Sequence, residues 1–199
     1  MYILNKHRLD MGILIGDDTL SRIDLFLIPV ISDGKIGFIN KKGEMVISPR
    51  FEDVRDSFIS EDSLVRVKVS NGKWGVINSI GNFIIPFVYK QINKAGRYLY
   101  EVQIEEYNRS CRGLVDSNNQ TIVPFGVYGN FYPVYEGGKF IIVKTIDLKM
   151  GILNERGTLV IPAIYDAMQF PGSSLPIVAA WRGNELATVL ISTYLRDLH

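Results

Sequence analysis

The sequence repeats itself at a constant spacing, and this repeat limits the possible folds of the chain more than any other feature. Four segments align with one another: KIGFINKKGEMVISP, KWGVINSIGNFIIP, CRGLVDSNNQTIVP and KMGILNERGTLVIP. Their shared glycines are Gly37, Gly75, Gly113 and Gly151, and each difference (75 − 37, 113 − 75, 151 − 113) is 38 residues. A fixed period of this length is typical of arrays in which one small unit stacks on the next. We therefore expect one continuous array without an internal linker.

Each copy predicts a β-hairpin. An Asn or Asp is followed three residues later by Gly or Asn, in the pairs Asn40 and Gly43, Asn78 and Gly81, Asp116 and Asn119, and Asn154 and Gly157. This is the pattern of a type I turn that an Asx residue opens and a residue with positive φ closes. The flanking runs are rich in Val, Ile and Phe, which predicts strands at about residues 73–78 and 83–89 in the second copy.

Three further columns recur in register. A proline lies in or at the end of the second strand of each copy, where a residue without a backbone N–H predicts a bend. The shared glycine lies inside the first strand, and we expect a neighbouring backbone or ring to pack over it. An aromatic residue follows the proline, and we expect it to fill a slot between neighbouring units. The prolines are Pro49, Pro86, Pro124 and Pro162, and the aromatic residues are Phe51, Tyr89, Tyr128 and Tyr165.

A third strand is predicted in each copy, at residues 64–69, 98–104, 139–144 and 176–181. The predicted fold is all-β, with tandem repeats of about 38 residues, each a three-stranded antiparallel unit, in an open curved or superhelical array. A β-propeller is the alternative, although its blades usually have four strands. We expect a single domain, 1–199, with repeats at 34–70, 71–108, 109–146 and 147–181, a degenerate N-terminal cap at 1–33 and a C-terminal cap at 182–199. Residues 184–191 would supply the opening strand of a truncated last unit.

This set of columns resembles the WG repeat, or KWG repeat, of bacterial proteins, most literally in GKWGVINSIGNFIIPFVY. The resemblance covers about residues 34–181, although three of the four copies lack the tryptophan. It implies an all-β repeat scaffold that binds partners, and members of the family occur near bacterial toxin and secretion systems.

The sequence offers little that predicts catalysis. His7 and His199 lie at opposite ends of the chain, and Cys111 occupies the position of the repeat lysine. The segment EGGKF contains Gly-Gly-Lys but lacks the Ser or Thr and the glycine spacing of a phosphate-binding loop. We therefore expect no catalytic residue, no cofactor and no metal site.

The charge and the hydropathy pattern exclude further classes. The 22 basic and 21 acidic residues nearly cancel, so we expect no nucleic acid partner. No run approaches the roughly 20 apolar residues that span a bilayer, so we expect no membrane insertion. A single cysteine and the lack of a recognisable signal peptide favour the cytoplasm. The oligomeric state stays open, because unpaired end strands could join two copies.

The best candidate for a binding surface is the aromatic-rich segment FGVYGNFYPVYEGGKF at residues 125–140. We assign Phe131, Tyr132 and Tyr135 as its candidate binding residues, because aromatic side chains on a rigid scaffold serve as interface anchors. Trp181 and Arg182, at the end of the last predicted third strand, are a second candidate. These residues favour a non-catalytic protein-binding module, and the family resemblance adds an immunity or accessory role in a toxin or secretion system. A carbohydrate or small-ligand binding module is the alternative.

Overall fold

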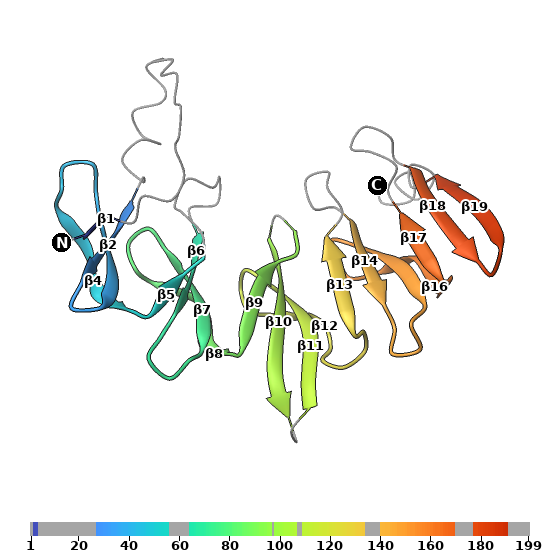
Figure 1. Cartoon of the computed structure of the whole chain (residues 1–199), viewed down its shortest axis with the longest axis horizontal. Helices are drawn as coiled ribbons and strands as arrows, with labels where there is room; N and C mark the ends of the chain where they lie inside the picture. The colour runs from blue at the N-terminus through green and yellow to red at the C-terminus, as the bar shows by residue number, and fades with distance from the viewer. Residues whose placement is uncertain are drawn as a thin grey trace, which may run out of the picture. The chain divides into compact units, whose positions relative to one another are not determined.

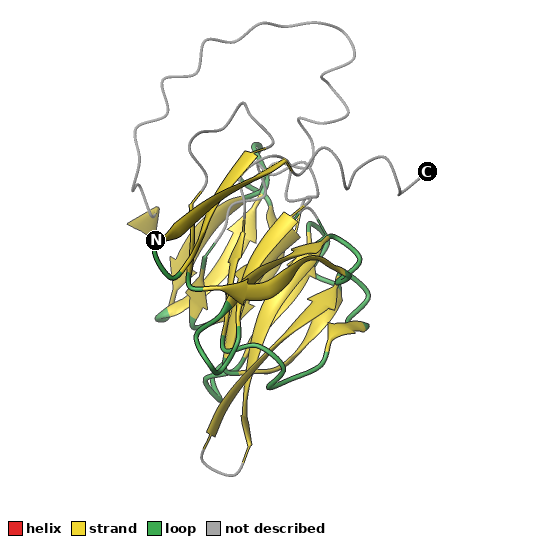
Figure 2. Cartoon of the chain, turned by 90° about the vertical axis from the view of Figure 1, so that its right-hand side faces the viewer, coloured by secondary structure: helices red, strands yellow, loops and turns green. Residues whose placement is uncertain are grey.

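The computed structural model describes residues 2–3, 27–55, 64–96, 98–106, 109–133, 140–169 and 177–190. Over these residues the chain forms strands joined by turns and loops, and Figure 2 shows no helix among them. The chain divides into two compact units, Met1–Gln91 and Ile92–His199. The prediction of an all-β chain of small antiparallel sheets is therefore confirmed.

The first unit contains two antiparallel sheets of four strands each (Figure 1). Sheet A has the order β1-β2-β3-β4, and sheet B has the order β5-β6-β7-β8. The strands of sheet A are β1 (Tyr2–Ile3), β2 (Ile28–Ser32), β3 (Lys35–Ile39) and β4 (Met45–Phe51). Those of sheet B are β5 (Asp53–Val54), β6 (Leu64–Lys68), β7 (Trp74–Asn78) and β8 (Phe83–Tyr89).

The second unit contains three antiparallel sheets, and its first strand begins at the unit boundary. Sheet C is made of β9 (Gln91–Lys94), β10 (Leu99–Glu106), β11 (Arg109–Asp116) and β12 (Thr121–Val123). Sheet D is made of β13 (Asn130–Pro133), β14 (Phe140–Lys144), β15 (Met150–Asn154) and β16 (Leu159–Tyr165). Sheet E has only β17 (Ala167–Gln169), β18 (Ile177–Arg182) and β19 (Glu185–Leu190).

Two details of the predicted repeat differ from the structure. Four of the five sheets have four strands rather than three, and in sheets B, C and D the additional strand is a short one after the aromatic residue that was not predicted. The predicted third strand does not pair with the hairpin strands of its own copy. It pairs with the short strand before it and with the glycine strand of the next copy, as β6 does with β5 and β7. A turn of a few residues connects β6 to β7, so this partner is the nearest one along the chain. Each sheet therefore joins the end of one sequence repeat to the start of the next.

The predicted hairpin turns are present in all four copies. In the first copy, the N–H of Gly43 donates to the carbonyl oxygen of Asn40, and the Asn40 side chain accepts from the N–H groups of Lys42 and Glu44. The closing residue has positive φ in every copy: 82° at Gly43, 83° at Gly81, 61° at Asn119 and 75° at Gly157. Asn119 thus adopts the backbone conformation that glycine adopts elsewhere.

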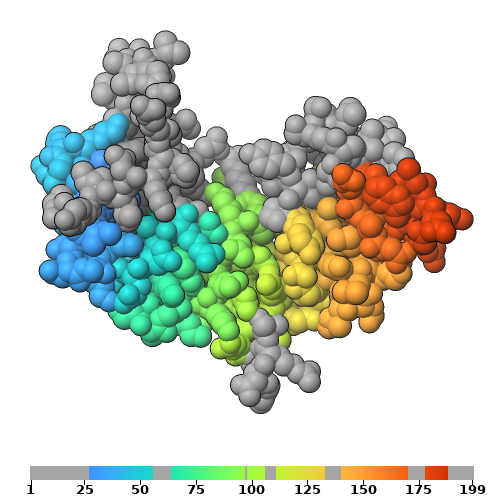
Figure 3. Space-filling model, in the orientation of Figure 1, coloured from blue at the N-terminus to red at the C-terminus, as the bar shows by residue number. Residues whose placement is uncertain are grey.

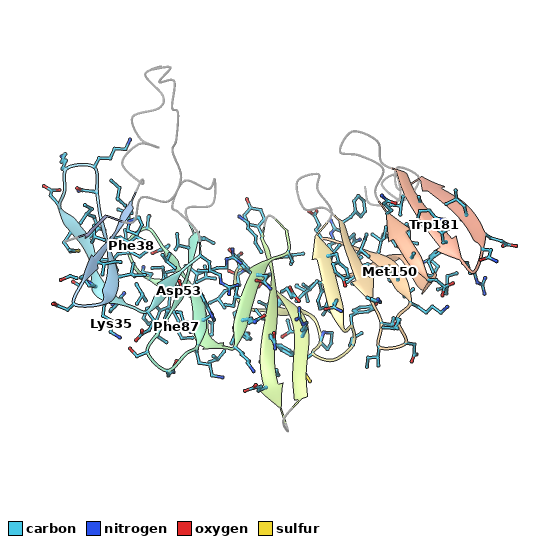
Figure 4. All side chains as sticks on the ribbon, viewed as in Figure 1. Lys35, Phe38, Asp53, Phe87, Met150 and Trp181 are labelled. Atoms are coloured by element: carbon cyan, nitrogen blue, oxygen red, sulfur yellow. The ribbon has the colours of Figure 1, made fainter. Side chains whose placement is uncertain are left out.

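The glycine and proline columns form one structural device, a bulge. In sheet A, Ile36 is opposite Phe51 and Phe38 is opposite Ile47, so one residue of β3 faces three residues of β4. The bulged strand crosses closely over Gly37, and a Cβ atom there would lie 2.7 Å from the nitrogen of Pro49. In sheet B the ring of Phe87, which Figure 4 labels, lies over Gly75 in the same way. The expectation that a backbone or ring packs over the glycine is confirmed.

The hydrophobic cores lie between consecutive sheets within each unit. In the first unit, Phe38 and Phe51 of sheet A pack with Val65, Val67 and Ile77 of sheet B. In the second unit, one cluster joins sheets C and D, and another joins sheets D and E. The aromatic column contributes to these clusters, because Phe51 is a member of the first and Tyr128 and Tyr165 pack against the other two.

The predicted caps are described in part. Residues 4–26, which include the expected degenerate strand at 11–18, lie outside the described residues. At the other end, β19 lies where residues 184–191 were expected to supply the opening strand of a truncated unit.

Candidate functional site

The candidate residue Phe131 lies in the core rather than on the surface. It lies on β13, is 5% exposed and belongs to the cluster between sheets C and D. Its ring meets that of Tyr128 edge to face, with 5.9 Å between the centroids. Burial raises the pKa of the Tyr128 hydroxyl. Phe131 is therefore not available as a surface anchor.

Tyr132, the next residue of β13, lies on the opposite face of the strand and is 43% exposed. It is directly opposite Ile142 of β14, and Ile142 belongs to the cluster between sheets D and E. Tyr132 thus lies at the edge of the layer that separates these two sheets. Tyr135 lies outside the described residues.

Trp181 lies on a different surface, the face of sheet E that points away from sheet D. Along β18, Val178 and Ala180 are buried, and Val178 packs in the cluster between sheets D and E. Because side chains alternate along a strand, Ala179 and Trp181 occupy the other face. Figure 4 labels Trp181 on β18. The structure therefore does not bring Tyr132 and Trp181 together on one face.

We name this surface the outer face of sheet E and define it by its strand register. Trp181 lies opposite both Ala167 of β17 and Leu186 of β19, and Ala179 lies opposite Gln169. Leu186 is 59% exposed, and Trp181 and Ala179 are partly buried. None of these residues belongs to the two hydrophobic clusters of the second unit. The outer face of sheet E consists of Ala167, Gln169, Ala179, Trp181 and Leu186.

The position of Trp181 differs in chemistry from its counterparts in sheets B, C and D, whereas sheet A has the apolar Ile31 at this position. The sheets can be aligned on the glycine column, in which Ala187 is the residue of sheet E. In this alignment Trp181 takes the position of Lys68 of β6, Gln103 of β10 and Lys144 of β14. These three residues are polar or charged. The one sheet of the second unit whose face is not covered by a further described sheet thus carries an aromatic residue at this position.

Polar groups surround one end of the outer face. Arg182 and Glu185 are opposite each other at the turn between β18 and β19, and both are exposed. Asp166 forms an ion pair with Lys149 and accepts a hydrogen bond of 2.7 Å from the N–H of Gly183. The Gly183 N–H and the Lys149 ammonium together hold the pKa of Asp166 below its ordinary value. This carboxylate therefore stays ionised and ties the turn of sheet E to sheet D.

A buried polar network in sheet C was not predicted from the sequence. Glu101 is 7% exposed, forms an ion pair with Arg112 and accepts a hydrogen bond of 3.1 Å from Asn93. Glu101 shares its face with Leu114, which belongs to the cluster between sheets C and D. The only sequence signal was Arg112 in the column that holds Ile36, Trp74 and Met150. We assign this network to the packing of the sheets.

The described residues also bear on metal binding and membrane insertion. Within the described ranges, no group of three or more His, Cys, Asp or Glu residues could hold a metal ion. The described part of the chain also has no helix long and apolar enough to cross a membrane.

Comparison with protein families supports the repeat assignment. A family model described as "WG containing repeat" matches residues 36–74, 74–95 and 150–173. No curated protein matches the chain. Similar solved structures include BamB from Moraxella catarrhalis, at 14% identity and a TM-score of 0.34, with 81% of this chain and 52% of that chain covered. Another is the WD40 β-propeller domain of Doa1, at 11% identity and a TM-score of 0.33, with 82% of this chain and 64% of that chain covered. The chain thus spans about half of the first structure and less than two thirds of the second.

Proposed function

Because the chain belongs to the WG-repeat family, we propose that it is a non-catalytic protein-binding module whose partner docks on the outer face of sheet E. The partner presents an apolar protein surface that takes the place of a further sheet. The proposal includes a cytoplasmic location and no nucleic acid partner. An immunity or accessory role in a bacterial toxin or secretion system is its narrowest form.

The observation that carries the proposal is the pair Trp181 and Leu186, which lie opposite each other on this face. In sheets C and D the equivalent face is covered by the next sheet of the same unit. On sheet E it carries Trp, Leu and two Ala residues, with Leu186 59% exposed. An exposed apolar patch with a polar rim is typical of a protein interaction site.

Trp181 supports this function more directly than the other residues. Tryptophan and arginine are enriched among the residues that contribute most to binding free energy, and such residues lie near the centre of an interface. Trp181 lies in the middle strand of sheet E, whereas Arg182 lies at its turn. We therefore expect Trp181 to act as the central anchor and Arg182 to contribute at the rim, where charge mainly affects the association rate.

The experiment is capture of partner proteins from a lysate of the source organism by the immobilised full chain. Wild-type protein and the Trp181→Ala variant are compared, and Tyr132→Ala serves as the matched aromatic control. We expect Trp181→Ala to weaken capture by about tenfold or more, since loss of a central aromatic anchor has this effect. Tyr132→Ala should retain capture, and thermal unfolding should show that both variants are folded.

The opposite pattern contradicts the assignment. If Tyr132→Ala loses the partner and Trp181→Ala keeps it, the binding surface lies at β13. A wild-type chain that captures no specific protein argues against the proposed function itself.

Carbohydrate binding is a second candidate, because Gln169 places an amide on the same face as the aromatic ring of Trp181. A glycan array separates the two functions. A sugar signal that disappears in Trp181→Ala, together with no captured protein, favours this alternative.

A further inference from the structure

Among the described residues, sheet E has three strands, whereas every other sheet has four. Its order is β17-β18-β19, so β19 pairs with β18 along one side (Figure 1). In sheets A to D the strand equivalent to β19 is followed by a further strand on its other side. Among the described residues no strand occupies this position in sheet E. In Figure 3 the residues of β18 and β19, at the red end of the bar, form part of the face that is drawn.

The other described edge strands are protected against pairing with another chain, and β19 is not. Natural proteins protect sheet edges with short strands, prolines and bulges. The edges β1, β5, β9, β12, β13 and β17 are two to four residues long. The long edges β4, β8 and β16 each contain a proline and a shift in register. In contrast, β19 has six residues, Glu185–Leu190, with neither proline nor glycine.

Ala187 determines what kind of strand can lie beside β19. Ala187 is opposite Ala180, as Gly151 is opposite Val143, so it occupies the glycine column. In the other sheets a Cβ atom in this column would lie 2.6 to 2.9 Å from the nearest atom of the bulged strand. Ala187 carries such a Cβ atom. A strand that pairs with this edge must therefore be regular rather than bulged, which excludes β4, β8 and β16 of another copy.

The strand β19 itself meets this requirement. Its register with β18 runs without a shift from the pair of Ile177 and Leu190 to the pair of Arg182 and Glu185. A regular strand can pair with a second copy of itself in the antiparallel direction. With the centre of pairing at Ala187 or at Thr188, Glu185 is not opposite the Glu185 of the second copy. The chain carries a net charge of +1, so two copies repel each other little.

The residues that follow β19 lack the signal that brings a fourth strand alongside in the other sheets. In those sheets an Asn or Asp opens the turn and a Gly or Asn closes it. The corresponding positions after the glycine column of sheet E hold Leu190 and Thr193, and residues 191–199 contain no glycine and no proline. The sequence therefore does not predict that this segment folds back onto β19.

We propose that β19 pairs in an antiparallel manner with β19 of a second copy of the chain, which joins the two sheets E into one continuous sheet. A two-fold axis perpendicular to the joined sheet keeps equivalent faces on the same side. The outer faces of the two copies, each with Trp181 and Leu186, then lie next to each other. This inference does not depend on the proposed function, although it would double the area of the proposed binding face.

The first test is the molecular mass of the full chain in solution, measured by light scattering over about a hundredfold range of concentration, since a weak dimer forms by mass action. The mass should rise from 22.5 kDa towards twice that value. The variant Leu186→Lys should stay monomeric, because an edge lysine opposes strand pairing. Leu159→Lys is the matched control on the proline-protected edge strand β16 and should dimerise like the wild type.

The second test detects symmetric pairing directly. In a Cys111→Ser background, single cysteines are placed at Ala187, at Thr188 and, as a control, at Leu159. A two-fold axis brings one residue of β19 opposite its own copy, at a Cα separation of about 4.5 to 5.5 Å that a disulfide can bridge. We expect oxidation to cross-link the chain at position 187 or 188 and not at position 159.

Three outcomes would overturn the proposal. The chain could stay at 22.5 kDa over the whole concentration range. It could dimerise without a cross-link at either position of β19, which means that another surface joins the copies. It could dimerise only after residues 191–199 are removed, which means that this segment covers the edge of β19 in the full chain.

Discussion

Gly151 lies directly against the backbone of Ala163. A Cβ atom on Gly151 would be 2.8 Å from both the nitrogen and the Cα atom of Ala163, and 2.7 Å from the carbonyl oxygen of Ile161. These neighbours are backbone atoms of the bulged strand β16 and cannot move aside as a flexible side chain can. The glycine column thus exists because the bulge of the proline strand needs the space.

The variant Gly151→Ala should lose about 2 to 3 kcal/mol of unfolding free energy, because the added methyl group overlaps with the backbone of β16. Urea denaturation measures this loss. Gly129→Ala, directly before β13 of the same sheet, is the matched control, because the nearest atom to a new Cβ atom there is 3.7 Å away. It should leave the midpoint unchanged or raise it. Equal losses in the two variants would mean that backbone entropy, and not the close approach, explains the glycine column.

Replacement of Leu148 by glycine should stabilise the chain by about 0.5 to 1 kcal/mol. Leu148 has φ of +64° in the turn between β14 and β15 and is 64% exposed, so it bears the cost of a left-handed conformation without burial in return. Glycine removes this cost but loses more conformational entropy on folding, and the gain is the difference. The control Ile146→Gly, in the same turn and without positive φ, should destabilise the chain. A lower urea midpoint for Leu148→Gly would show that the leucine side chain stabilises the turn.

At the position that opens each hairpin turn, Asn and Asp should be interchangeable, whereas replacement by alanine should destabilise the chain. The side chain of Asn78 accepts hydrogen bonds from the N–H groups of Ile80 and Asn82, at 3.2 and 2.9 Å. Asn78→Ala should therefore cost about 1 kcal/mol. Asn78→Asp should stay close to the wild type, because Asp116 makes the same two bonds in the third copy. Thermal unfolding distinguishes the variants, and equal stability of all three proteins would contradict the role of the side chain.

The carboxylates Glu52 and Asp166 should respond differently to the loss of their lysine partners. Lys35 is the main cause of the lowered pKa of Glu52, whereas the hydrogen bond from the N–H of Gly183 is the largest single cause of the lowered pKa of Asp166, and Lys149 adds to it. Lys35→Met should thus return the pKa of Glu52 most of the way to its ordinary value. Lys149→Met should return that of Asp166 only in part. Titration of the carboxyl carbons by NMR measures both values.

The lowered pKa values of Glu52 and Asp166 also determine how the stability of the chain depends on pH. A carboxyl group whose pKa is lowered by folding stabilises the chain at pH values above its ordinary pKa. This contribution to the free energy of unfolding is lost as the pH falls through the pKa of the folded state. Acid should therefore weaken the links made by Glu52 and Asp166, and high salt should reduce the effect of both lysines because the pairs are exposed. Lysine substitutions that leave both carboxyl titrations unchanged would show that the pairs do not form in solution.

The ion pair of Glu101 and Arg112 should be replaceable as a pair but not one residue at a time. Arg112→Met should cost about 2 kcal/mol or more, because it leaves the buried Glu101 carboxylate without its cation. The double variant Glu101→Ile with Arg112→Met copies Ile142 and Met150, the residues at the same register positions in sheet D. Its free energy of unfolding should be equal to or higher than that of the wild type, or lower by no more than about 1 kcal/mol. A double variant that is less stable than Arg112→Met would contradict this reasoning, and urea denaturation decides.

The local structure of each hairpin could be predicted from the sequence, because short-range chemistry determines it. Asn40 and Gly43 form the predicted turn, and Gly37 meets Pro49 where a bend and a close approach to the glycine were predicted. The predicted strand at 83–89 coincides with β8. In each case the residues that determine the conformation are close along the chain, so their pattern is enough.

The grouping of strands into sheets and the exposure of each face were decided only in the tertiary structure. Strand alternation tells which residues share a face, but not which face another sheet covers. Phe131 and Tyr132 are neighbours in sequence, yet one lies in a core and the other is 43% exposed. Trp181 lies on the outer face because the opposite face of β18 packs against sheet D. By itself the sequence determined the repeat, its turns and the bend at the proline, whereas long-range packing determined the surfaces available for binding.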